Sequence, residues 1–164
     1  MTADDSKLTH VDEQGRARMV DVGDKEVTRR SATAEGWIRM QPSTLEAIRQ
    51  DTVKKGDVLA VAQIAGISAG KRAAEWIPLC HPLQIDSIVV SLSLDVDLPG
   101  VKVLARAGLS GRTGAEMEAL VAASAALLTV YDMCKALDRE MEIGTIRLVE
   151  KSGGRTGTWR RRET

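Results

Sequence analysis

Alternating hydrophobic and polar residues predict strands in several parts of the chain. The alternation is clearest over Ile88–Val96, and it resumes over Val101–Leu109 after a Pro99-Gly100 turn. Two alternating segments joined by a short turn are typical of a β-hairpin. Further strands are expected at Arg16–Val22, Val27–Met40 and Met141–Val149.

Helical segments are expected between these strands. A short helix should begin at Pro42, with Ser43 as its N-cap and Glu46 completing a capping box. A second helix, rich in Ala and Gly, is expected over residues 57–76 and must end before Pro78.

A third helix should follow a second capping box, made by Thr113 and Glu116, and reach about Leu137. Its stretch Ala119–Tyr131 is almost purely apolar but too short to cross a membrane, so it reads as a buried helix. Strands in hairpins, with helices interspersed without regular alternation, predict an α+β fold: an antiparallel sheet with helices on one face.

Composition narrows the functional classes. The chain has 164 residues, 43% of them hydrophobic, so we expect a single domain over 1–164 with loose ends at 1–8 and 159–164. Aromatic residues make up only 2%, which argues against nucleic-acid recognition by base stacking. Lys+Arg and Asp+Glu both number 23, so no net charge draws the chain to DNA or membranes. The polar N-terminus and two cysteines favour a cytoplasmic protein with reduced thiols.

The segment Ile77–Leu83 is the first candidate for chemistry. Pro78 and Pro82 hold the backbone between them extended, so Cys80 and His81 would be presented on a rigid loop. His81 could then bind phosphate or transfer protons near neutral pH. A rigid connector with a buried, hydrogen-bonded histidine fits the same pattern.

The end of the long apolar helix is the second candidate. Asp132 and Lys135 are three residues apart, so they are neighbours on one helix face and could act as an acid/base pair. A surface ion pair, worth less than about 1 kcal/mol, is the plainer interpretation. Lys55 precedes the expected start of the second helix, where an anion could bind.

Glu118 lies on nearly the same face of this helix as Asp132, about 21 Å away along the axis. One helix cannot bring both side chains to one small ligand. An antiparallel pairing of the helix with its copy could, so we expect a two-fold interface with shared sites.

Several segments, in order and spacing, resemble the family of cyclic pyranopterin monophosphate synthase, the MoaC family of molybdenum cofactor biosynthesis. The similarity covers roughly residues 8–158. The most specific segments are IPLCHPL at Ile77–Leu83, TGAEMEAL at Thr113–Leu120, YDMCKA at Tyr131–Ala136 and KSGG at Lys151–Gly154.

The resemblance implies conversion of 3′,8-cyclo-7,8-dihydroguanosine triphosphate to cyclic pyranopterin monophosphate, with release of pyrophosphate. It implies a ferredoxin-like fold and a homohexamer of three dimers with sites at the dimer interfaces. No cofactor is implied, although magnesium could accompany the triphosphate. By the same resemblance, the catalytic residues are Asp132, Lys135 and Lys55, and the substrate-binding residues are Leu79, Cys80, His81, Met117, Glu118, Glu116, Lys151 and Arg30.

Two other interpretations remain open from the residues alone. Cys80, His81 and Cys134 could be three ligands of a catalytic zinc ion in a purine cyclohydrolase. The same pocket could also belong to a pterin- or nucleotide-binding module without turnover.

Overall fold

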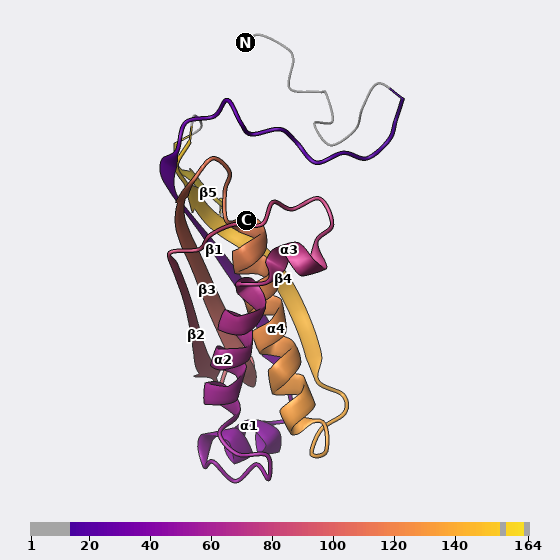
Figure 1. The fold of residues 1–164 in the computed structure, drawn as a ribbon. Helices are drawn as coiled ribbons and strands as arrows, with labels where there is room; N and C mark the ends of the chain where they lie inside the picture. The colour runs from indigo at the N-terminus through magenta and orange to yellow at the C-terminus, as the bar shows by residue number, and fades with distance from the viewer. Residues whose placement is uncertain (1–13, 155–156, 163–164) are drawn as a thin grey trace.

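The computed structural model describes residues 14–154 and 157–162 (Figure 1). The expected loose segment 1–8 lies outside the described residues. In chain order the elements are β1 (Thr28–Arg39), α1 (Pro42–Arg49), α2 (Val58–Gly70), α3 (Ala73–Trp76), β2 (Ser87–Asp95), β3 (Gly100–Gly111), α4 (Glu116–Cys134), β4 (Glu142–Ser152) and β5 (Trp159–Arg160).

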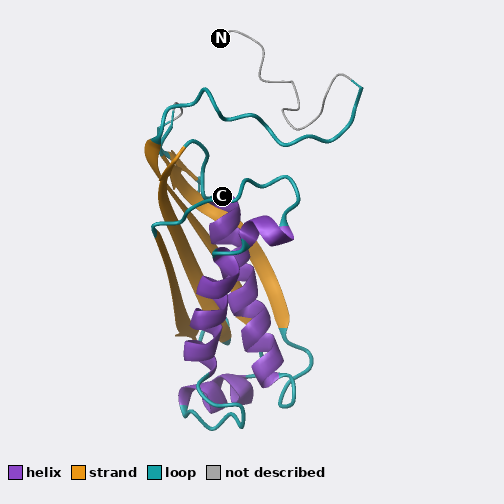
Figure 2. Cartoon of the chain, in the orientation of Figure 1, coloured by secondary structure: helices purple, strands orange, loops and turns teal. Residues whose placement is uncertain are grey.

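The five strands form one antiparallel sheet in the order β2-β3-β1-β4-β5. Without the short helices and β5, the chain order is strand, helix, strand, strand, helix, strand, which is the ferredoxin-like motif. Helices α2 and α4 lie side by side on one face of the sheet (Figure 2). The predicted α+β fold is therefore confirmed.

Strand alternation places the core between the sheet and the helices. Along β3, Val103, Ala105 and Ala107 are buried against the helical layer, whereas Leu104 and Arg106 point the other way and are exposed. The face of the sheet turned away from α2 and α4 is called the outer face below. It is lined by polar and charged side chains as well as apolar ones, as is typical of one face of an antiparallel sheet.

Helix α4 is the central helix of this core. By length and composition it could cross a membrane, but most of its apolar residues are packed inside the fold, and Ala122, Leu127 and Val130 are 0% exposed. The prediction that Ala119–Tyr131 forms a buried helix is confirmed.

Helix α2 packs closely on α4 because glycine and alanine line the contact. A Cβ added to Gly66 would lie 2.8 Å from the carbonyl oxygen of Ala122. A Cβ on Gly70 would lie 3.0 Å from the carbonyl oxygen of Glu118. Close backbone approach of this kind needs residues without side chains.

Both predicted capping boxes are wrong. Gln41 occupies the N-cap position of helix α1 and Pro42 lies in its first turn. No side chain hydrogen-bonds to the N-terminus of this helix. Glu46 instead pairs with Arg49 at 2.7 Å. Helix α4 begins at Glu116, with Ala115 as its N-cap and no side-chain cap. Thr113 therefore lies before the helix, and the Glu116 carboxylate pairs with Lys151 at 3.1 Å. Each carboxylate pairs with a cation instead of completing a capping box.

Three expected elements also differ from the structure. The helix expected over 57–76 is interrupted at Lys71 and Arg72, and α3 then ends at Trp76, just before Pro78. Residues 16–22 form no strand, although Ala17 makes an isolated β-bridge. Residues from 159 on are not simply a loose end: Trp159 and Arg160 pair with Lys151 and Glu150 of β4.

Candidate active site

Three charged side chains meet at the C-terminal end of α4. The Asp132 carboxylate accepts hydrogen bonds from Nζ of Lys135, one turn further on, and from Nζ of Lys55, in the loop before α2; both distances are 2.7 Å. Lys55 also donates to the backbone oxygen of Asp132 at 2.8 Å, one of the carbonyls that a helix leaves unpaired at its end. The three predicted catalytic residues therefore form one group, called the lysine–aspartate cluster below.

The loop that carries Lys55 is held in place by the start of α2. Asp57 caps this helix by accepting a hydrogen bond from the backbone N–H of Ala60 at 2.9 Å. Gly56 has φ of +94°, a conformation that glycine adopts without strain. The sequence Lys-Gly-Asp thus makes a turn and a cap that together direct Lys55 to the end of α4.

Charge in the lysine–aspartate cluster favours anion binding. Hydrogen bonds from Lys135 and Lys55 lower the pKa of Asp132 to about 2, so it is ionised throughout the neutral range. The same contact raises the pKa of Lys135. The cluster therefore carries an excess of one positive charge and is about half exposed to solvent. In the free protein its lysines are proton donors and ligands for phosphate oxygens.

A second group of predicted residues lies at the N-terminal end of α4. Glu118 is only 2% exposed, and burial raises the pKa of its carboxyl group. Its Oε1 is 3.9 Å from Sγ of Cys80, and its Oε2 has no hydrogen-bond partner among the described residues. Burial, and then the charge of Glu118, raise the pKa of the Cys80 thiol. Met117, beside Glu118, is half-buried.

His81 is hydrogen-bonded to the chain that precedes β1. Its Nε2 lies 2.8 Å from the carbonyl oxygen of Val20. A carbonyl oxygen only accepts, so Nε2 carries the proton and Nδ1 is left for a ligand. Leu79, two residues earlier, is half-buried in the same loop. The Val20 contact could not be found from sequence, because nothing in the spacing relates residues 20 and 81.

Lys151, Glu116 and Arg30 lie near this second group. Lys151 pairs with Glu116, which begins α4. Arg30 donates from Nε to the Gly111 carbonyl oxygen at 2.9 Å. Gly154 has φ of +70°, a conformation that glycine adopts without strain. Arg30, Gly153 and Gly154 line a hollow of about 790 Å³.

The predicted residues therefore fall into two groups at opposite ends of α4. Glu118 and Asp132 are 14 residues apart, which corresponds to about 21 Å along a helix. Within one chain the structure does not bring Asp132, Lys135 and Lys55 together with Cys80, His81 and Glu118.

Within one chain, the structure does not bring together the three ligands of the zinc interpretation, Cys80, His81 and Cys134. Cys80 lies at the N-terminal end of α4 beside Glu118, whereas Cys134 ends the same helix and is 0% exposed. Burial raises the pKa of the Cys134 thiol to about 11. Among the described residues no three His, Cys, Asp or Glu side chains are placed to hold a metal ion.

Comparison with known proteins identifies the family of this chain. The sequence model of the MoaC family matches residues 19–154, a range that includes both groups. Three proteins named cyclic pyranopterin monophosphate synthase, from Brucella ovis, Brucella canis and Brucella suis, are each 56% identical to this chain over 153 residues. The matched region covers 93% of this chain and 93% of each relative. The chain therefore belongs to the MoaC family.

Proposed function

We propose that this protein is a cyclic pyranopterin monophosphate synthase of molybdenum cofactor biosynthesis. It would convert 3′,8-cyclo-7,8-dihydroguanosine triphosphate to cyclic pyranopterin monophosphate and release pyrophosphate. The observation that carries this proposal is the lysine–aspartate cluster, which lies inside the region shared with the Brucella synthases. The reaction would take place in the cytoplasm, where the unpaired thiols of Cys80 and Cys134 stay reduced.

The cluster suits the phosphate side of this reaction. Closing a cyclic phosphate requires a substrate hydroxyl to attack the α-phosphorus while the bond to pyrophosphate breaks. Lys55 and Lys135 would hold the phosphate oxygens and donate protons, while Asp132 fixes the direction of both ammonium groups. No resident cofactor is needed for this step, and magnesium would enter with the triphosphate as part of the substrate.

The second group suits the ring of the substrate. Glu118 offers a buried carboxyl oxygen without a partner, and His81 leaves Nδ1 available. A nitrogen-rich ring that fills this end would supply the missing hydrogen bond to Glu118, and such a bond is worth most where water is excluded. The nearby Lys151 and Arg30 add positive charge for the phosphates.

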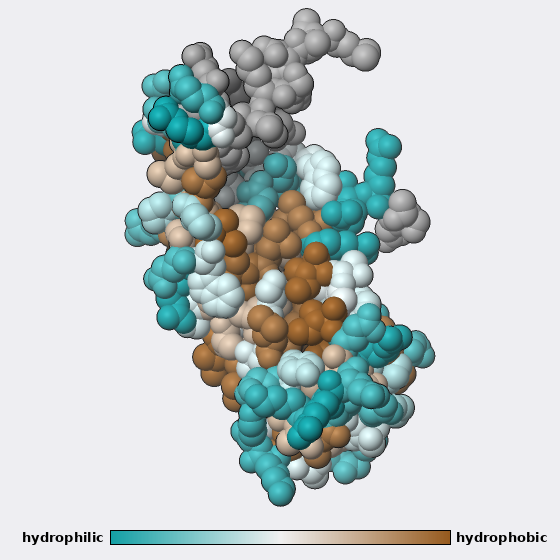
Figure 3. All heavy atoms as spheres, turned by 90° about the vertical axis from the view of Figure 1, so that its right-hand side faces the viewer, coloured by the Kyte–Doolittle hydropathy of each residue, from teal (hydrophilic) through white to brown (hydrophobic). Residues whose placement is uncertain are grey.

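Pairing of two copies through α4 would join the two groups into one site. A two-fold axis at the level of Ala125 would set Asp132 of one helix beside Glu118 of the antiparallel copy, because both lie seven residues from that level. Near this level of the same helix, Leu128 is 52% exposed. On the side of the molecule where α4 and β4 lie, hydrophobic side chains gather in the middle of the surface between hydrophilic ends (Figure 3). We propose this dimer as the unit from which a homohexamer of three dimers is built.

Release of pyrophosphate from the cyclised triphosphate tests the proposed function. We expect release by the protein and at least about a 100-fold lower rate for Lys135→Ala. Lys102→Ala is the matched control, since Lys102 is an equally exposed lysine paired with a carboxylate, Asp95, on the sheet. Binding of intact substrate without release by the unaltered protein would favour the non-catalytic binding module instead.

A further inference from the structure

A polar hollow of about 460 Å³ lies on the outer face of the sheet, near the end where β1 begins. Its floor is Gly108 of β3, which pairs with Ser87 of β2 on one side and Ser31 of β1 on the other. Ser31 pairs in turn with Ser152 of β4, and their hydroxyl groups are 2.8 Å apart. Three serines from three strands therefore surround a position without a side chain.

Two arginines flank this floor along the strands. Arg106 precedes Gly108 by two residues, and Arg29 pairs with Ser110, two residues beyond Gly108. At about 3.4 Å per residue, each arginine starts roughly 7 Å from the level of Gly108, within reach of its long side chain. Both are exposed and line the hollow. Within residues 14–154 and 157–162, neither side chain has an ion pair or hydrogen bond.

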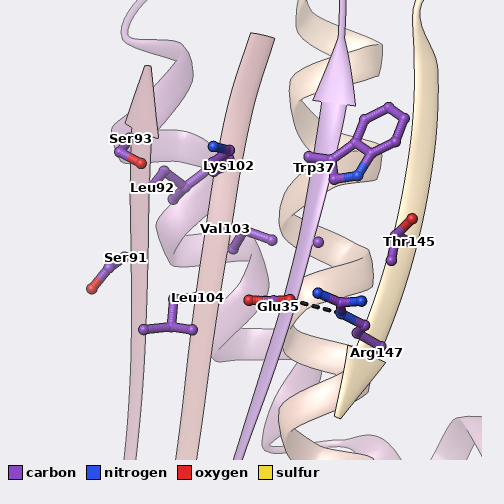
Figure 4. A pocket seen from close by; sticks show the side chains of 11 residues that line it. Glu35, Trp37, Ser91, Leu92, Ser93, Lys102, Val103, Leu104, Thr145 and Arg147 are labelled. Carbon is purple, nitrogen blue, oxygen red and sulfur yellow. Dashed lines mark hydrogen bonds and ion pairs between the residues drawn. The ribbon is translucent and has the colours of Figure 1, made fainter. Parts of the chain in front are cut away.

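In a neighbouring hollow on the same face, the cationic side chains are paired with carboxylates. That hollow, of about 560 Å³, is lined by Glu35, Trp37 and Arg147 among others (Figure 4). Arg147 is bound by Glu35 at 2.8 Å, and Lys102 is paired with Asp95. The cations there are neutralised within the chain, whereas Arg29 and Arg106 are not.

The remaining charged groups leave the first hollow positive. Asp86 is its carboxylate, exposed at the rim. Arg30 is also in the lining, with its Nε donating to the Gly111 carbonyl oxygen. The two unpaired guanidinium groups, those of Arg29 and Arg106, thus accompany one carboxylate, in a place where serine hydroxyl groups can also donate.

We propose that this hollow is a binding site for a pyrophosphate group, separate from the lysine–aspartate cluster. Guanidinium groups bind phosphate oxygens with paired hydrogen bonds, and the serine hydroxyls donate to the oxygens that the arginines leave free. Gly108 makes room, since a Cβ there would come within 3.0 Å of Ser87 Oγ. The site is on the outer face, whereas the lysine–aspartate cluster lies at the end of α4 on the helical side.

Calorimetric titration with inorganic pyrophosphate tests this site, in full-length protein carrying Lys55→Ala and Lys135→Ala so that the cluster cannot bind it. In that background we expect binding with one pyrophosphate per chain, and Arg29→Ala/Arg106→Ala should raise Kd at least tenfold. Arg39→Ala/Arg49→Ala is the matched control, because it removes two exposed arginines that Glu142 and Glu46 already neutralise. Asp86→Asn should lower Kd.

Gly108→Val separates a shaped site from general electrostatic attraction, because it fills the floor and leaves every charge in place. We expect it to abolish binding while the far-ultraviolet circular dichroism stays unchanged. Absence of binding in the Lys55→Ala/Lys135→Ala background would overturn the proposal, since all pyrophosphate would then belong to the cluster. Equal weakening by the control pair, or full binding by folded Gly108→Val, would also overturn it.

Discussion

Asp132 illustrates how much of the site depends on single residues. Its carboxylate holds both lysines, and its backbone oxygen accepts a further hydrogen bond from Lys55. Because the side chain is about half exposed, it adds little to the stability of the fold. The role of Asp132 is to orient the ammonium groups of Lys55 and Lys135.

Asp132→Asn should therefore leave the protein folded and remove its activity. An amide cannot hold two ammonium groups by charge, so the lysines lose their common orientation. We expect the rate of pyrophosphate release to fall at least about 100-fold, with a nearly unchanged melting temperature. A variant with ordinary turnover would show that the cluster is only a surface ion pair.

Glu118 should make stability depend on pH in the opposite sense to most carboxylates. Burial raises its pKa above 4.5, so the folded protein holds this proton more tightly than the unfolded chain. The free energy of unfolding therefore decreases as pH rises above the unfolded value towards the folded pKa. The Glu118→Gln protein has no such carboxyl group to ionise. Between the unfolded and the folded pKa of Glu118, its free energy of unfolding should therefore rise relative to that of the unaltered protein.

Urea denaturation between about pH 4 and pH 8 measures this effect. Glu116→Gln is the control, since Glu116 is a neighbouring carboxyl group that is paired with Lys151 rather than left without a partner. Parallel stability curves for Glu118→Gln and the unaltered protein would mean that Glu118 ionises in the fold as easily as in the unfolded chain.

At the scale of elements, the contact between α2 and α4 positions both ends of the site. Helix α2 carries Lys55 before its N-terminus and leads through α3 to the loop with Cys80 and His81. Its closest approach to α4 is at Gly66 and Gly70. Widening this contact would move the lysine and the proline-bounded loop relative to α4.

Gly66→Ala should destabilise the protein although alanine is the better helix former. The added Cβ would meet the Ala122 carbonyl oxygen at 2.8 Å, and such overpacking costs about 1–3 kcal/mol. That exceeds the gain of about 1 kcal/mol from helix propensity. Ile64→Ala, at a 67% exposed position of the same helix, is the control and should change the free energy of unfolding much less. A more stable Gly66→Ala protein would show that the helices have room to separate.

At the scale of the whole molecule, the decisive question is whether one chain or two make a site. The two groups of site residues are separated by most of the length of α4. An antiparallel pair of α4 helices would bring together groups from different chains, and each dimer would then hold two equivalent sites.

Mixing two inactive variants tests this arrangement. Glu118→Ala and Lys135→Ala damage opposite ends of α4, so a mixed dimer would contain one site with both changes and one intact site. After subunit exchange at equal amounts, we expect recovery of about one quarter of the original activity. Lys135→Ala mixed with Asp132→Asn is the control and should recover none, because both changes fall in the same group. Lack of recovery by the first mixture, despite proven exchange, would mean that each site lies within one chain.

Local patterns along the sequence are enough to predict much of this protein. The β2–β3 hairpin follows from alternation around Pro99-Gly100, and the buried helix α4 from its apolar stretch. The contact of Asp132 with Lys135 follows from a separation of three residues on a helix. These features depend on neighbours in the chain, which the sequence displays directly.

Contacts between distant segments were decided only by the tertiary structure. Nothing in the spacing brings Lys55 to Asp132, 77 residues away, or sets Cys80 against Glu118. Glu116 looked like part of a helix cap, but the approach of β4 gave it Lys151 as a partner instead. The physical reason is the same in each case: a long polar side chain has several possible partners of similar strength, and the packing of the elements selects which of them is within reach.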